Sequence, residues 1–159
     1  MPGIGAAEIY HYGGVPKLLG CYEAELHGIL TAAAIKGYDT VMNIGCAGGY
    51  YVAGLARLFP RTHVFAFDID DARLLCAETA GANGVLSRVT LLGECVPADF
   101  GRLASGRTLV LCDARAPNCR YCGPTLPAPW HAATWSSNCI RTWTPPSLPR
   151  FPPASLPPT

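Results

Sequence analysis

The last 46 residues of this 159-residue chain contain no aspartate and no glutamate. All eleven acidic residues lie between Glu8 and Asp113, whereas eleven of the fifteen prolines and all three tryptophans follow Asp113. The first 113 residues therefore carry a net charge of −3, and the remainder carries +4. A compact domain seldom divides its composition so sharply. The sequence thus predicts two unlike regions, a domain over 1–113 and a tail over 114–159.

Long apolar runs and a secretory leader are missing as well. No stretch approaches the roughly 18 apolar residues of a membrane span, and residues 1–10 do not pair a basic segment with an apolar run. The formal charge of +1 gives no global field for nucleic acid or membrane. We therefore expect a cytoplasmic protein with neither kind of partner, whose eight cysteines are reduced thiols. The oligomeric state stays open.

Helical and strand patterns alternate along residues 22–113. Apolar residues recur at helical spacing in some segments, and short β-prone runs separate them. The predicted elements are a helix over 22–35, a strand over 40–44, a helix over 50–58, a strand over 63–67, a helix over 72–82, and strands over 89–92 and 108–112. This order is typical of an α/β, Rossmann-like fold, a parallel sheet with helices on both faces. We expect about four strands, fewer than a complete sheet of this kind, followed by an irregular tail.

Four groups suited to ligand binding directly follow these strands. A glycine-rich turn over residues 45–49 follows the first strand, and Asp68, Glu94 and Asp113 follow the other three. Parallel strands end at one edge of their sheet, and ligands of such sheets bind outside that edge. The sequence therefore predicts a ligand site there.

The turn and Asp68 together indicate a cofactor that contains a nucleoside. Small residues let the backbone approach a ligand, and the start of the next helix offers N–H groups. Asp68 lies 23 residues after Gly45, where an acidic side chain can bond both ribose hydroxyls. A dinucleotide fingerprint needs glycine at the sixth position from Gly45, and here that position is Tyr50, which disfavours NAD.

The sequence resembles class I S-adenosylmethionine (SAM) dependent methyltransferases over roughly residues 17–113. The turn has the G-x-A-x-G spacing of their motif I, residues 64–70 (VFAFDID) resemble motif II, and residues 109–113 (LVLCD) resemble motif IV. Residues 89–95 (VTLLGEC) resemble the stretch that closes over adenine. The segment KLLGCYEAEL, which starts at Lys17, resembles the one that precedes motif I.

This resemblance implies SAM as cofactor, Asp68 as the ribose ligand and Glu94 beside the adenine. Asn43 stands where the family often has an acid, and its amide can still hold the turn or the amino group of the ligand. Asp113 is the one residue that we name for a catalytic, acceptor-side role. The implied cofactor-binding residues are Asn43, Gly45, Cys46, Ala47, Gly49, Asp68, Ile69, Glu94 and Asp113.

Other interpretations of the same residues stay open. The glycines can be ordinary turn residues, Asp70 can cap the helix that follows it, and Glu94 can be a solvated loop acid. The cysteines at positions 46, 76 and 112 fit small core residues. The domain can also be a non-catalytic nucleoside-binding module, an NAD-type domain or a purely structural one.

The tail has the ligand types of a zinc site, Cys119-x-x-Cys122 followed by His131 and Cys139, but no β-prone hairpin surrounds the cysteine pair. We therefore expect no metal site. A frameshift explains the composition more simply. If one base is restored after the codon of Asp113, the codons can encode Asp-Ala-Glu-Gly-Ala-Glu-Leu. The same shift over residues 133–143 can encode an apolar strand that also contains acidic residues. Both stretches resemble methyltransferases of the FkbM type. A Pro-rich disordered tail is the alternative.

These expectations combine into one functional hypothesis, methyl transfer from SAM to an unidentified acceptor such as a hydroxyl oxygen. The groups that bind the acceptor normally follow motif IV, where the tail now stands. We therefore expect a truncated, inactive enzyme with residual SAM binding and an uncovered edge at the fourth strand. An intact chain with an unusual C-terminal part is the other reading.

Overall fold

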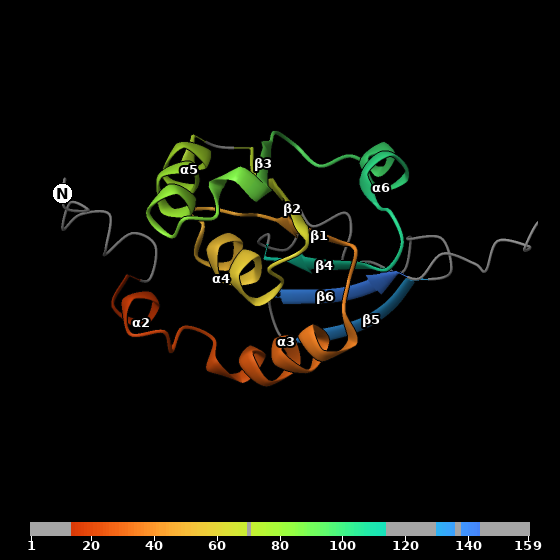
Figure 1. The fold of residues 1–159 in the computed structure, drawn as a ribbon, viewed down its shortest axis with the longest axis horizontal. Helices are drawn as coiled ribbons and strands as arrows, with labels where there is room; N and C mark the ends of the chain where they lie inside the picture. Colours follow the sequence, from red (N-terminus) through yellow and green to blue (C-terminus); the bar gives the residue numbers. More distant parts are fainter. Residues whose placement is uncertain (1–13, 70, 114–129, 136–137, 144–159) are drawn as a thin grey trace, which may run out of the picture.

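The computed structural model describes residues 14–69, 71–113, 130–135 and 138–143 (Figure 1). Its centre is a parallel sheet of β1 (Thr40–Ile44), β2 (His63–Phe67), β3 (Val89–Leu92) and β4 (Thr108–Cys112), in the order β3-β2-β1-β4. All residues of β1 and β4 are buried, as continuous apolar runs require in a sheet covered on both faces. The predicted parallel four-stranded sheet is confirmed, with the predicted strand limits.

Helices cover both faces of this sheet. On one face, α3 (Ala24–Lys36), α4 (Tyr50–Leu58) and α5 (Ala72–Ala82) enclose the larger core, to which β1 contributes Val41 and β4 contributes Leu109. On the other face, α6 (Pro97–Leu103) packs Phe100 against Met42 and its neighbours. Alternate residues of one strand thus enter different cores, as the pleat dictates.

Three short helical segments were not predicted from the sequence: α2 (Gly14–Leu18), a 3-10 turn η1 (Leu86–Arg88) and α6. Each has seven residues or fewer, too few turns for apolar periodicity to show. Helix α6 starts at a proline, and the Asp99 carboxylate accepts a hydrogen bond from the Val96 amide at 2.9 Å and pairs with Arg102. Its stability therefore comes from local capping and from burial of one aromatic ring.

Two further strands differ from the prediction of an irregular tail. β5 (Trp130–Trp135) and β6 (Asn138–Trp143) pair antiparallel, and β6 also pairs antiparallel with β4, so the edge of β4 is covered (Figure 1). The full order is β3-β2-β1-β4-β6-β5. The prolines of the tail fall outside residues 130–143, and that stretch is rich in β-prone Trp, Thr and Ile. The overall density of prolines concealed this shorter, strand-compatible segment.

Within the described ranges, no helix combines the length and the apolar character needed to cross a lipid bilayer.

Candidate functional site

The glycine-rich turn joins β1 to α4 and adopts a conformation that few residues accept. Gly45, Ala47 and Gly49 all have positive φ, at 80°, 41° and 85°. A Cβ atom added at Gly49 would lie 2.9 Å from the Cα of Cys76 in α5. Only glycine therefore lets α5 approach the start of α4 this closely.

Hydrogen bonds fasten this turn to the end of β2. The amides of Gly45 and Cys46 donate to the Phe67 carbonyl at 2.8 and 2.9 Å, and the Ala47 amide donates to Oδ2 of Asp68 at 2.7 Å. The Gly49 amide donates to the Cys46 carbonyl at 2.8 Å. Four amides of the turn are thus engaged within the protein, unlike those of a loop that cradles a pyrophosphate.

Asn43 lies inside the sheet rather than at its surface. Its side chain is fully buried and donates to the Leu111 carbonyl of β4 at 3.2 Å, while its Oδ1 atom has no partner among the described residues. Asn43 can therefore affect a ligand only through the strands that it connects.

The other predicted cofactor contacts reach the carboxyl edge but are open to solvent. Ile69, directly after Asp68, is 72% exposed, and Glu94 is exposed in the loop after β3. The Asp68 amide donates to the Leu92 carbonyl at 3.2 Å, which brings the ends of β2 and β3 together. The structure thus gathers the turn, Asp68 and Glu94 at one edge, as the strand order requires.

On the β4 side of this edge, charged and phenolic side chains form a group that the sequence did not reveal. It consists of Lys17, Tyr22, Glu23, Tyr51 and Asp113, and we call it the edge cluster. The Tyr51 hydroxyl donates to Oε2 of Glu23, and the Lys17 ammonium lies 4.5 Å from the centroid of the Tyr22 ring. The Asp113 amide donates to the Ile44 carbonyl at 2.8 Å, so that its carboxyl group stands where β1 and β4 end.

Burial and like charge shift the protonation equilibria of the edge cluster. Burial, reinforced by the nearby Glu23 carboxylate, raises the pKa of Asp113 to about 6, and the Lys17 ammonium opposes this rise. Burial lowers the pKa of Lys17 and raises that of Tyr22 to about 12. Asp113 therefore changes charge near neutral pH, which suits a group that exchanges protons.

One backbone signal accompanies the edge cluster. Among the described residues, the non-glycine residues with positive φ are Glu23, at 47°, and Ala47, at 41°, and both lie at this edge. Such strain concentrates at functional sites. The sequence indicates the segment around Glu23 only as the stretch before motif I. Nothing in the sequence shows that Tyr51 forms a hydrogen bond with Glu23.

Within the described ranges, the cysteines at positions 21, 46, 76, 95 and 112 are in no disulfide. Cys46 of the turn and Cys76 of α5 are buried and hydrogen-bonded to each other, which raises the pKa of Cys46 and lowers that of Cys76. They pack as small core residues between the turn and α5. Cys119 and Cys122 lie outside the described residues, and no metal-binding group of three His, Cys, Asp or Glu side chains occurs within them.

No protein-family model matches the chain, and no curated protein matches it in sequence. Solved structures do resemble it. An O-methyltransferase family protein from Burkholderia thailandensis superposes with a TM-score of 0.52 at 10% identity, over 85% of this chain and 58% of the other. The SAM-dependent methyltransferase SibL, in its apo form, gives a TM-score of 0.51 at 14% identity, over 87% of this chain and 59% of the other.

The chain spans just under three fifths of the length of these two methyltransferases. At such low identity the likeness concerns the fold alone. It agrees with the parallel sheet of this chain and the helices on both of its faces. The chain thus has a Rossmann-like α/β fold similar to that of these two methyltransferases.

Proposed function

We propose that this chain binds SAM at the carboxyl edge of its sheet and derives from an enzyme that transfers the methyl group of SAM to a hydroxyl oxygen. The observation that carries the proposal is the 2.7 Å hydrogen bond between the Ala47 amide and Oδ2 of Asp68. It joins the glycine-rich turn to the acidic side chain that suits ribose hydroxyls, across 21 residues of sequence.

The state of the turn amides favours SAM over NAD. A dinucleotide presents a pyrophosphate that needs free amides at the turn. Here the amides of Gly45, Cys46, Ala47 and Gly49 already donate within the protein. A cofactor without phosphate, such as SAM, fits this arrangement, with Glu94 and Ile69 beside the adenine and Asn43 supporting the turn from within the sheet.

Asp113 has the position and the protonation behaviour of an acceptor-side base. When bound, SAM supplies an electrophilic methyl group. Asp113, at the end of β4, would accept the proton that a hydroxyl acceptor gives up when its oxygen takes the methyl group and the methyl–sulfur bond of SAM breaks. A carboxyl pKa of about 6 makes Asp113 a stronger base than an ordinary aspartate while it stays mostly ionised at pH 7.

The proposal is tested by calorimetric titration of the full chain with SAM, with NAD as control. We expect saturable SAM binding and none of NAD. Asp68→Ala should weaken SAM binding by at least about tenfold, because a charged acceptor for two hydroxyls is lost. Asp68→Asn keeps an oxygen that can accept from the Ala47 amide. Comparing it with Asp68→Ala therefore separates loss of the charged ribose contact from loss of the bond that holds the turn.

Asp71 provides the matched control, since it caps α5 three residues later without a side-chain cap hydrogen bond. Asp71→Ala should leave SAM affinity unchanged. If the wild-type chain, folded by circular dichroism, bound no SAM or bound NAD equally well, the proposal would be wrong.

We further propose that the parent enzyme is of the FkbM type, acts in the cytoplasm, and is read in a shifted frame from about residue 114, which leaves this form without turnover. The absence of acidic residues over 114–159 and the acids regained by restoring one base support this. Sequencing of the coding DNA decides it. A gene with no acid-bearing frame downstream of the Asp113 codon would refute the shift.

A further inference from the structure

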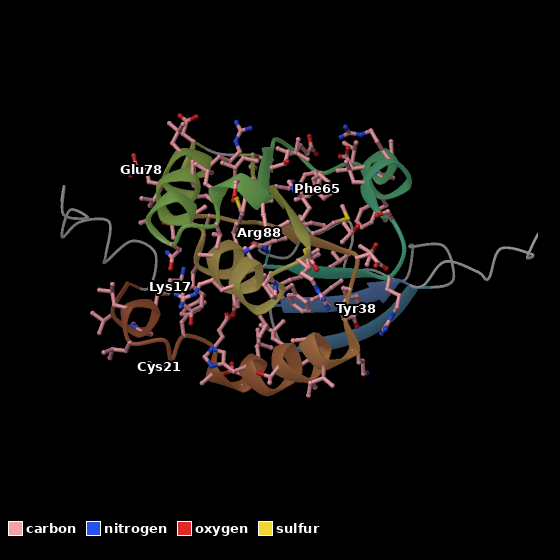
Figure 2. The ribbon with its side chains drawn as sticks, viewed as in Figure 1. Lys17, Cys21, Tyr38, Phe65, Glu78 and Arg88 are labelled. Carbon is pink, nitrogen blue, oxygen red and sulfur yellow. The ribbon has the colours of Figure 1, made fainter. Side chains whose placement is uncertain are left out.

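A groove of about 790 Å³ runs along the outer side of α4, and neither Asp68 nor Asp113 lines it, although Lys17 and Tyr51 of the edge cluster do. Side chains of α2, α3 and α5 form its walls, and it meets the glycine-rich turn at Gly48 and Tyr50. Figure 2 shows Lys17 directed into the space between α2 and α4, at this end of the groove. A hollow of this size accommodates a small ligand rather than scattered solvent.

The groove is mainly apolar, and its rim leaves large aliphatic side chains in water. Leu18 of α2 and Leu19, which follows it, are 66% and 74% exposed, and Leu55, Leu58 and Leu75 continue the apolar surface inward. Exposed leucines beside a concave apolar surface are typical of a binding site, since burying them against a ligand is favourable.

The charge along the groove has one sign. Its basic side chains are Lys17, His27 and Arg57, and none of the described residues that line it is Asp or Glu. The carboxylates of Glu23 and Asp113 already offset Lys17. Arg57 donates to the Asn83 amide oxygen at 3.4 Å, and within the described part of the chain no carboxylate forms an ion pair with it. An uncompensated positive charge thus stands at the far end.

Gly54 keeps the middle of the groove open. It lies inside α4, is exposed to the groove, and a Cβ atom added there would meet nothing within 4 Å. Glycine inside a helix costs roughly 0.5–1 kcal/mol relative to alanine. At Gly54 the absence of a side chain leaves room between the apolar walls, at this loss in helix stability.

From these observations we propose that the groove binds an amphipathic anion, an apolar chain or ring bearing one carboxylate, with the carboxylate at Arg57 and the apolar part over Gly54. One end of the groove adjoins the proposed SAM site at Gly48, Lys17 and Tyr51, whereas Gly54 and Arg57 lie further along it, and the proposal does not depend on SAM binding. The apolar walls supply the affinity, and the one-signed charge selects anions over cations.

The test uses decanoate as the probe and the full chain in isothermal titration calorimetry. We expect saturable binding of decanoate and none of decyltrimethylammonium, which has the same chain and the opposite charge. Gly54→Leu should weaken decanoate binding at least tenfold by filling the groove, while raising helix propensity. Arg57→Gln should weaken it by about two- to fivefold, as expected for an exposed charge pair.

Gly101→Leu is the matched control, because Gly101 of α6 is also exposed with nothing within 4 Å and does not line the groove. Binding of decanoate that Gly54→Leu leaves unchanged, or equal binding of the cation, would overturn the proposal. Light scattering that shows a dimer which Gly54→Leu converts to monomer would also overturn it, since a second copy would then cover the groove.

Discussion

The two halves of the carboxyl edge of the sheet are formed by different kinds of group. On the β2 side, backbone amides and small residues form the site, held by the bonds of Gly45, Cys46 and Ala47 to β2 and Asp68. On the β4 side, the edge cluster places ionisable side chains from α2, from the segment before α3, from α4 and from the end of β4 within reach of one another. The comparison teaches that the first half depends on backbone shape and the second on charge, so each should fail under a different perturbation.

The largest expected effect comes from distorting the backbone half. Gly49→Ala places a Cβ atom 2.9 Å from the Cys76 backbone at a φ of 85°, and we expect a loss of about 2–4 kcal/mol in the free energy of unfolding. Gly54→Ala, in open space inside α4, should gain about 0.5–1 kcal/mol. Urea denaturation measures both. A Gly49→Ala chain within 0.5 kcal/mol of wild type would show that shape does not govern this half.

A smaller effect is expected from the charged half, and it should depend on pH. The pKa of Asp113, about 6 in the folded chain, lies above its unfolded value of about 3.9, so the ionised form is less favourable in the fold. Wild type should therefore lose stability relative to Asp113→Asn as the pH rises from about 4 through 6. Allowing for the remaining solvent exposure of this side chain, the difference should reach about 1–2 kcal/mol at pH 8 and nearly vanish near pH 4.

Denaturation at the two pH values measures this difference. The same series on Asp71→Asn, at the exposed start of α5, serves as the control. An Asp113→Asn chain that is less stable than wild type at pH 8 would contradict the assignment.

The smallest expected effects are two shifts in the pKa of Asp113, which should have opposite directions. Glu23→Gln removes a like charge and should lower the pKa of Asp113, whereas Lys17→Met removes an opposite charge and should raise it. Carbon-detected NMR titration of the Asp113 carboxyl group follows both. Shifts in the same direction would mean that burial alone, without these two charges, sets its protonation.

The sequence was sufficient for the backbone half because each of its determinants is local. Continuous β-prone runs fixed the limits of β1, β2, β3 and β4, and strand order alone brings the turn and Asp68 to one edge. The dense glycine pattern likewise predicted the turn after the first strand. The Gly49 contact with α5, however, became visible only in the folded chain.

The edge cluster could not be predicted because its partners are distant in sequence and unremarkable one by one. Glu23 and Tyr51 are 28 residues apart, and Asp113 joins them only through the pairing of β4 with β1. Strands β5 and β6 were not predicted for another reason, since the average composition of the proline-rich tail hid the proline-free stretch over residues 130–143. Tertiary pairing decides both cases, and single-sequence patterns carry little of it.

The hydrogen bonds of the glycine-rich turn also bear on the thermodynamics of ligand binding. Because Asp68 and the Phe67 carbonyl hold the turn through hydrogen bonds within the protein, its conformational entropy is lost on folding. A cofactor that docks there meets a preorganised surface, and little of its binding free energy is spent on ordering the chain. The heat capacity change of binding should then reflect the buried ligand surface alone, and any rise in melting temperature should follow simple mass action with ligand concentration.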